Sequence, residues 1–254
     1  WYGAEPWQVS PELRRRLHER AVPVEAVEAS KAPVRQVVRQ GSEVDLNAYQ
    51  APHHSVGEHT AITSALLIYR DPNDGAERIC QQLALRTSPS TLALPLDHHS
   101  RLTLAADACR RRGEAIPAAL WIGHHPAVLL AAACVGSEPQ VWDRLGALVG
   151  EMFGVVDSLS AGAGLRVPAA AEMICEGSID AAIGMVPGGF PAGNGFQALE
   201  GPALTMQVTH VSQRREALWC DAVPDQRDGY HAAGIPLEVA LLETVGRQAP
   251  SLLN

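Results

Sequence analysis

The segment from residue 61 to residue 86 most constrains what this chain can fold into. The apolar run AITSALLIY (61–69) ends at the turn-forming stretch DPNDG (71–75), and the run RICQQLALR (78–86) follows. Branched and aromatic residues favour strands, whereas Asp, Pro, Asn and Gly in succession favour a tight turn. The sequence therefore predicts a β-hairpin, and with it an antiparallel sheet.

Helices and further strands alternate along the rest of the chain. A helix is predicted where apolar residues recur at helical spacing between a capping residue and a glycine or proline, and a strand where a short apolar run meets turn residues. This order indicates a mixed α+β barrel or sheet rather than a doubly wound parallel fold. The predicted helices cover about 11–20, 100–112, 124–134, 138–150 and 234–250 (the last amphipathic), and the further strands cover 117–123, 172–176 and 203–212.

Charge and composition limit the classes of function that this chain can have. The formal charge of −8 disfavours a nucleic-acid partner, because a phosphate backbone requires a basic face. The basic run at 110–112 is interpreted as the solvated last turn of a helix. No apolar run is long enough to span a membrane and no leader peptide opens the chain, so we expect a soluble, cytoplasmic protein that begins, with Trp1, after its native start. The five cysteines are widely spaced, which indicates free thiols.

The histidines are the main candidates for a functional site, since the sequence has no GxSxG elbow, HExxH helix or P-loop. His53–His54, His98–His99 and His124–His125 are adjacent pairs, with His59 nearby. Imidazoles bind metals and exchange protons near neutral pH. Because adjacent side chains diverge on a strand, one metal ion would need a histidine from each of several pairs. The alternative is that these histidines are loop residues bonded to backbone or water.

Two smaller patterns each allow two interpretations. His124 and His125 precede a predicted helix that begins at Pro126, where backbone N–H groups favour an anion. They mark either a ligand site or a simple strand-to-helix turn. Glu172 and Glu176 are four residues apart on a predicted strand and share one face. They serve either acid–base chemistry or ordinary ion pairing.

Five stretches of the chain together resemble the UbiD-like decarboxylases, which are prenylated-FMN-dependent carboxy-lyases of aromatic and α,β-unsaturated acids. The resemblance implies a split β-barrel of flavin-reductase type with flanking helices. It also implies that the C-terminal α/β domain of the family, which doubles the length of its members, is missing here. The matching stretches, in the order and spacing of the family, are APVRQVVRQGSEVDLNAYQAPHH (32–54), HTAITSALLIYRDPNDG (59–75), GEAIPAALWIGHHPAVLLAAA (113–133), LRVPAAAEMICEGSI (165–179) and MQVTHVSQRREALW (206–219).

The resemblance also implies where the family's metal and cofactor residues fall. The family's metal-binding Asn corresponds to Arg78, and its catalytic Arg corresponds to Leu83. The metal-binding His matches His99, whereas the metal-binding Glu falls on Val141, with Glu138 near but out of register. One of three metal ligands is thus retained, so no metal is expected. Arg78 could instead hold a phosphate as a fixed cation.

The acid-bearing loop of the family, Glu-Gly-Pro-Phe-Gly-Glu, corresponds to PGGFPA at 187–192. Its two acids fall on Pro187 and Ala192, and Phe190 is retained. The Glu–Arg–Glu network that the resemblance implies is therefore replaced by Pro187, Leu83 and Ala192, none of which ionises. Such residues cannot donate the proton that decarboxylation requires.

Three hypotheses follow from the resemblance. The favoured one is a divergent, lyase-like enzyme that uses the former cofactor cavity for a small organic substrate without the standard mechanism. Its catalytic candidates are His99, Glu172, His124 and His125, and its pocket is lined by Arg78, Leu83, Pro187, Phe190 and Ala192.

The alternatives are a non-catalytic subunit that completes a UbiD-like partner, and a prenylated-FMN decarboxylase with a rewired proton donor. No cofactor is favoured, with prenylated FMN or FMN as the alternative, and a homo-oligomer or a UbiD-like partner subunit is expected. The expected domains are an N-terminal α/β segment (1–58), the split barrel (59–225) and a C-terminal helix (226–254).

Overall fold

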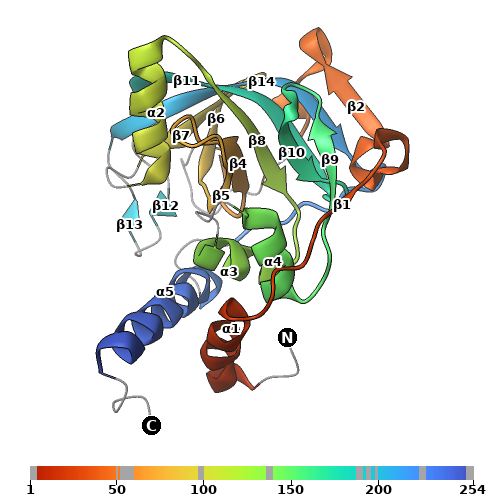
Figure 1. Cartoon of the computed structure of the whole chain (residues 1–254). Coiled ribbons are helices and arrows are strands. Elements are labelled where there is room, and N and C mark those ends of the chain that lie inside the picture. The colour runs from red at the N-terminus through yellow and green to blue at the C-terminus, as the bar shows by residue number, and fades with distance from the viewer. Residues whose placement is uncertain are drawn as a thin grey trace.

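A strongly curled antiparallel sheet forms the centre of the computed structural model, which describes residues 5–49, 51, 60–96, 100–135, 140–186, 191–192, 196–197, 200–222 and 227–249. Its strands are ordered β3-β6-β7-β14-β11-β8-β4-β5, and β2 pairs with β14 (Figure 1). Neighbouring strands are antiparallel throughout this sheet. The strands are β2 (Val37–Gln40), β3 (Ala61–Ile62), β4 (Leu66–Arg70), β5 (Glu77–Gln81), β6 (Ala84–Ser88), β7 (Thr91–Pro95), β8 (Ile116–Ile122), β11 (Met173–Val186) and β14 (Gly201–Gln213).

Smaller elements surround this sheet. In Figure 1, α1, α3, α4 and α5 gather below the sheet, whereas α2 lies beside β11. The helices are α1 (Val9–Leu17), α2 (Arg101–Arg112), α3 (Pro126–Val135), α4 (Val141–Val149) and α5 (Arg227–Gln248). A second sheet joins β1 (Glu25–Ala26), β9 (Gly154–Ser158) and β10 (Gly162–Pro168), and β12 (Pro191–Ala192) pairs with β13 (Phe196–Gln197). Short 3-10 turns are η1 (Pro6–Gln8), η2 (Ala29–Lys31), η3 (Pro33–Arg35), η4 (Gly41–Glu43) and η5 (Leu46–Ala48).

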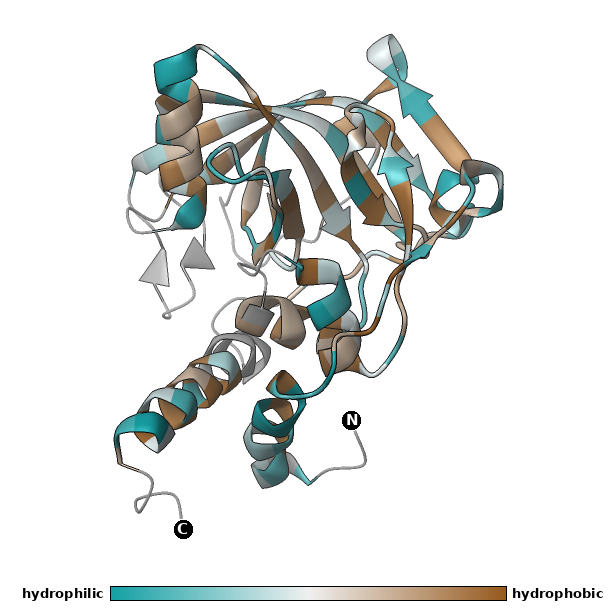
Figure 2. Cartoon of the chain, viewed as in Figure 1, coloured by the Kyte–Doolittle hydropathy of each residue, from teal (hydrophilic) through white to brown (hydrophobic). Residues whose placement is uncertain are grey.

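Two hydrophobic cores lie on opposite faces of the curled sheet. Along β4, Leu66 and Ile68 belong to the core shared with α3, α4 and the small sheet, whereas Leu67 and Tyr69 belong to the core inside the curl, under α2. A strand buried on both faces must be apolar at every position. This explains the uninterrupted run LLIY, and Figure 2 shows the same hydrophobic character along the central strands.

The longest strands, β11 and β14, cross the whole sheet and depend on one glycine. The register between them shifts after Glu176, at Gly177. A Cβ atom at Gly177 would collide with the backbone carbonyl oxygen of Gln207 on β14. A glycine is therefore required where the bulge brings the two backbones together.

The structure confirms the split-barrel architecture with flanking helices, and the predicted helices are all present. Two of the predicted strands are each divided in the structure. The strand predicted over 61–69 is interrupted at 63–65, and the run 78–86 forms two strands, of which β5 pairs with β4 and β6 with β3 and β7. The second arm of the predicted hairpin is thus only β5.

The C-terminal helix also differs from its prediction. Helix α5 begins at Arg227 and passes through Pro236, so it is longer than the predicted 234–250 segment. Ile235 and Val239 pack against the core, whereas Leu237 and Leu241 are exposed. Apolar residues therefore occupy both faces, and the expected single apolar face was wrong.

Candidate functional site

The α2 cleft is a cavity of about 410 Å³ between β5, β7 and the first turn of α2. It contains two arginines and several uncharged polar side chains. Its volume is in the range of small-molecule sites. The lining residues are Tyr69, Arg78, Ile79, Cys80, Gln81, Gln82, Pro95, Ser100, Arg101 and Leu102.

Arg78 is the buried cation of the α2 cleft. It is 2% exposed, and its guanidinium donates a hydrogen bond to Asp74 and lies with Nε 3.6 Å from Asp71 Oδ2. Both acids belong to the turn DPNDG, in which Asp71 Oδ1 accepts from the backbone N–H of Asn73. Nε of Arg78 has no hydrogen-bond partner among the described residues. The carboxylate nearest to Nε is its ion-pair partner Asp71, so Nε is enclosed beside the turn and Arg78 acts on the cleft through its positive charge.

The first turn of α2 supplies the other polar groups. Ser100 caps the helix, because its hydroxyl accepts from the backbone N–H of Thr103. Arg101 is half-exposed, with Nη1 3.8 Å from Asp71 Oδ2. Burial raises the pKa of Cys80 to about 12, so its thiol is neutral. The cleft therefore presents two arginines partly balanced by two aspartates, next to a helix N-terminus.

Leu83, where the family resemblance implies an arginine, lies between β5 and β6 and is packed in an apolar cluster. The cluster contains Ala61 of β3, Val186 at the end of β11 and Ala203 of β14, with Leu85 and Ala93. The loop that corresponds to the acid-bearing loop follows Val186 directly. Among the described residues, Leu83 is therefore held by hydrophobic contacts.

Several predicted residues cannot be placed. Pro187, Phe190 and His99 lie outside the described residues, as do Glu138, His53, His54, His59 and His98. Ala192 lies in β12, where its backbone pairs with Phe196 of β13. The roles proposed for these residues stay predictions.

The structure brings together the other three catalytic candidates, His124, His125 and Glu172. They line the Trp121 groove, an open cavity of about 920 Å³ between the end of β8, the start of α3, the segment after α4 and the segment after β14. Its remaining lining residues are Trp121, Gly123, Val128, Val149, Glu151, Met152, Phe153, Gly154, Pro168, Ala170, Leu218, Trp219, Cys220 and Asp221.

Backbone groups hold both histidines of the groove. Nε2 of His124 lies 2.7 Å from the carbonyl oxygen of Ser64, and Nδ1 lies 3.2 Å from that of His125. Burial lowers the pKa of His124, so its ring is neutral at pH 7. Nδ1 of His125 accepts from the backbone N–H of Ala127 at 3.1 Å and thus caps α3. These contacts match the simple strand-to-helix turn, which was the alternative to a ligand site.

Glu172 and Glu176 have separate roles. Glu172 Oε2 accepts from the backbone N–H of Leu218 at 3.0 Å, and Oε1 lies 3.5 Å from Arg214. Glu172 therefore fastens the segment after β14 to the end of β8.

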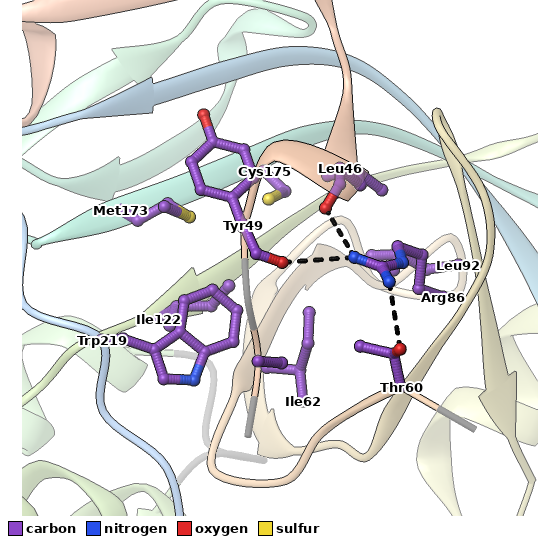
Figure 3. Close-up of a pocket in the computed structure, with 11 residues that line it drawn as sticks. Leu46, Tyr49, Thr60, Ile62, Arg86, Leu92, Ile122, Met173, Cys175 and Trp219 are labelled. Carbon is purple, nitrogen blue, oxygen red and sulfur yellow. Dashed lines mark hydrogen bonds between the residues drawn. The ribbon is translucent and has the colours of Figure 1, made fainter. Parts of the chain in front are cut away.

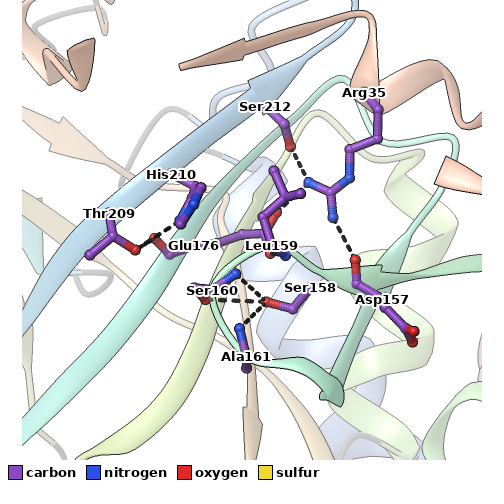
Figure 4. A network of polar contacts seen from close by, with 10 residues as sticks. All are labelled: Arg35, Asp157, Ser158, Leu159, Ser160, Ala161, Glu176, Thr209, His210 and Ser212. Carbon is purple, nitrogen blue, oxygen red and sulfur yellow. Dashed lines mark hydrogen bonds and ion pairs between the residues drawn. The ribbon is translucent and has the colours of Figure 1, made fainter. Parts of the chain in front are cut away.

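Glu176 is completely buried and pairs with Arg35 of η3 (Figure 4). It also accepts from the backbone N–H of Leu159 at 2.6 Å. Arg35 in turn donates to Ser212 Oγ at 2.7 Å and to the carbonyl oxygen of Asp157. This network joins the N-terminal segment, β9 and the central sheet, which matches the ion-pairing alternative.

A small apolar pocket lies inside the curl of the sheet, with Ile62, Ile122, Met173 and Trp219 around it (Figure 3). Arg86 closes one side by donating to the carbonyl oxygens of Leu46 and Tyr49 and to Thr60 Oγ1. Figure 3 shows these side chains converging on the centre of the pocket. The Arg86 contacts satisfy loop carbonyls, so the pocket is interpreted as part of the core.

Sequence reasoning missed Arg101, Trp121 and Trp219. Arg101 directly follows a helix cap, which is a signal for a side chain near a helix N-terminus. The two tryptophans gave no local signal, because they are 98 positions apart in the sequence. Within the described ranges no group of His, Cys, Asp or Glu is placed to hold a metal ion, and no helix there is long and apolar enough to cross a membrane.

The family model for the 3-octaprenyl-4-hydroxybenzoate carboxy-lyase Rift-related domain (UbiD) matches residues 25–227. This chain belongs to the UbiD family. An evolved dimeric form of the UbiD-class enzyme HmfF from Pelotomaculum thermopropionicum, solved with prFMN, shares 27% identity and a TM-score of 0.87 over 96% of this chain. HmfF with FMN shares 28% identity at a TM-score of 0.84. The matches cover 57% and 54% of those chains, so this UbiD-family chain spans just over half their length.

More distant structures share the fold of this UbiD-family chain. Apo 3,4-dihydroxybenzoic acid decarboxylase (AroY) from Klebsiella pneumoniae is 19% identical, with a TM-score of 0.86 over 98% of this chain and 54% of its own. The vanillic acid decarboxylase ShVdcCD of Sedimentibacter hydroxybenzoicus, in its open form, is 17% identical, with a TM-score of 0.82 over 98% and 53%. The architecture is thus retained at low identity.

The α2 cleft fits one part of the family's cofactor chemistry and not another. The guanidinium of Arg78 occupies the position that the resemblance implies for a metal ligand, and a fixed positive charge there is incompatible with a divalent cation. The positive charge of the same guanidinium, although it is shared with Asp71 and Asp74, fits a phosphate or carboxylate group better than a cation. The described residues therefore fit an anionic group without a bridging metal.

Proposed function

We propose that this chain is a divergent UbiD-family enzyme that binds a small organic carboxylic acid in the α2 cleft and converts it without the Glu–Arg–Glu network. The observation that carries the proposal is Arg78, a fully buried arginine that lines the cleft. Arg101 adds a second, accessible cation at the mouth of the same cleft. Two arginines beside a helix N-terminus favour a carboxylate.

The packing around Leu83 supports the second half of the proposal. Leu83 contacts a cluster of apolar side chains, so neither it nor its neighbours can move a proton. The polar side chains Gln82 and Ser100 flank the cleft and would position the ligand rather than transfer a proton. Because HmfF has been solved with prFMN and with FMN, the phosphate of a flavin is the competing ligand for the same arginines.

Calorimetric titration separates these ligands. Cinnamate and benzoate are compared with cinnamamide and benzamide, which have the same shape without the charge, and with FMN and prenylated FMN. The proposal expects binding of the acids and an affinity at least about 10-fold weaker for the amides, which corresponds to about 1.4 kcal/mol. Equal binding of acid and amide would refute the carboxylate site, and CO₂ release that depends strictly on prenylated FMN would support the rewired decarboxylase instead.

Arg101→Gln is the matched variant, because Arg101 is half-exposed and its replacement leaves the fold intact. We expect it to weaken acid binding about 10-fold, as for the loss of one charge-assisted hydrogen bond. Arg110→Gln, at the other end of α2, removes an exposed arginine outside the cleft and should leave binding unchanged. If the two variants bind acids equally, the cleft is not the site.

A second candidate function is a subunit that completes a UbiD-like partner. It is favoured by the exposed leucines Leu237 and Leu241 on the outer face of α5. Size-exclusion chromatography with light scattering tests it. A monomer or homo-oligomer that turns over a carboxylic acid alone would count against the partner role.

A further inference from the structure

The Trp121 groove is separate from the α2 cleft. The two cavities share no lining residue. At about 920 Å³ the groove is large enough for a small ligand. Nothing in the proposed function uses it.

The charge that lines the groove has one sign. Among the described residues that line it, Glu151, Glu172 and Asp221 are acidic, and none is Lys or Arg. Two of these acids are held in place: Glu172 by the N–H of Leu218 and by Arg214, which offsets part of its charge, and Asp221 by the hydroxyl and N–H of Thr63. Fixed carboxylates at the wall of a cavity raise the local concentration of cations.

Aromatic rings form the facing wall, and they carry unpartnered donors. Indole faces attract cations, and both Trp121 and Trp219 line the groove. Neither indole N–H has a hydrogen-bond partner among the described residues, although Trp121 is only 3% exposed. In Figure 3 the indole nitrogen of Trp219 lies on the ring edge turned away from Tyr49 and Cys175. Buried donors of this kind normally have an acceptor.

His125 adds a third donor. Since Nδ1 accepts the N–H of Ala127, the neutral ring carries its proton on Nε2, and the side chain lines the groove. We propose that the Trp121 groove is a second ligand site, which takes a small organic ammonium compound that also carries a carbonyl or hydroxyl oxygen. The ammonium would lie against the carboxylates, and the oxygen would accept from the indole or imidazole N–H groups.

Four related probes test both halves of this proposal by tryptophan fluorescence and calorimetry. Phenylalaninamide carries the ammonium and the carbonyl, phenethylamine only the ammonium, 3-phenylpropanamide only the carbonyl, and N-acetylphenylalanine a negative charge. We expect phenylalaninamide to bind tightest, and removal of the ammonium to weaken binding at least about 10-fold, equivalent to about 1.4 kcal/mol. Equal binding of phenylalaninamide and 3-phenylpropanamide, or preferential binding of the anion, would overturn the proposal.

Glu151→Gln tests whether the ammonium group binds in the groove. Glu151 is exposed, so the variant should fold normally. It should weaken phenylalaninamide about 3-fold or more and leave 3-phenylpropanamide unchanged. Glu43→Gln, an exposed acid in η4 outside the groove, is the control and should change neither affinity. Identical affinities in the two variants would place ammonium binding outside the groove. The probes that are expected to bind in the groove carry no free carboxylate. A negative result with them therefore leaves the carboxylate test of the α2 cleft unaffected.

Discussion

At the scale of single residues, Glu176 is the acid on which the central sheet most depends. It is fully buried, and its carboxylate is shared between Arg35 and the N–H of Leu159. Glu176→Gln leaves Arg35 buried without a counter-charge, and breaking a buried pair in this way costs about 3–5 kcal/mol. Urea unfolding measures the loss. Glu28→Gln, in the exposed pair with Lys31, is the control and should change stability by less than about 1 kcal/mol.

Gly123 provides a residue-scale test of close packing at the groove. It has φ +75°, and a Cβ atom there would be 2.6 Å from Cγ of Glu172 and would also meet its Cβ. Gly75 has nearly the same φ, +70°, but open space around it. Gly75→Ala should cost only about 1 kcal/mol for the left-handed backbone, whereas Gly123→Ala should cost clearly more. Equal free energies of unfolding would show that Glu172 moves aside freely.

At the scale of elements, the sequence predicts strands well and strand partners poorly. The run LLIY is apolar at every position because β4 is buried on both faces, so the strand itself was evident. The run 78–86 gave no sign that it divides between two sets of partners. That division depends on Gln82, whose N–H and side chain bond to Ala65, Leu83 and Pro95, contacts that join distant segments.

The candidate site divides in the same way. Arg78 and Leu83 were singled out through the family resemblance, and their roles stay predictions. His124, His125 and Glu172 were named as candidates of one site, and all three line the Trp121 groove. The backbone contacts that hold them, such as the N–H of Glu172 donating to the carbonyl oxygen of Gly123, were not predicted. A pattern of residue types does not record such contacts.

Helix α5 is joined to α1 by polar contacts as well as by the shared hydrophobic core, and the polar part is testable. Glu243 binds Arg14 at 2.8 Å and His18 at 3.1 Å, and Ser10 donates to Glu238 at 2.7 Å. Glu243→Gln should increase hydrogen exchange along α5 while the central sheet is unchanged. The control variant Glu43→Gln, in η4, should leave the hydrogen exchange of α5 unchanged. If exchange rises throughout the protein, the contact supports the whole fold rather than one helix.

At the scale of the whole molecule, stability should decline with acid in two stages. Burial lowers the pKa of His124 below its ordinary 6.5, so the folded state binds fewer protons than the unfolded state and stability falls as the pH drops below 6.5. Hydrogen bonds from Arg15 and Arg16 lower the pKa of Glu12 from 4.5 to about 2. Its contribution is complete above pH 4.5 and is lost as the pH falls toward 2.

Chemical unfolding measured from pH 7.5 to pH 3 tests this profile. His124→Gln should flatten the decline between pH 6.5 and 5.5, and Glu12→Gln should flatten the decline below pH 4.5. Salt should reduce the second effect more than the first, because Glu12 is near the surface and His124 is buried. If neither variant changes the pH profile of the unsubstituted protein, other groups control its stability in acid.

The apolar cluster around Leu83 limits which single substitutions this position accepts. An arginine at position 83 would place a charge among Ala61, Val186 and Ala203. A charge that is buried without a partner costs free energy. A cation can therefore be engineered here only together with a counter-charge, because the two substitutions are compatible with the fold as a pair and not one at a time.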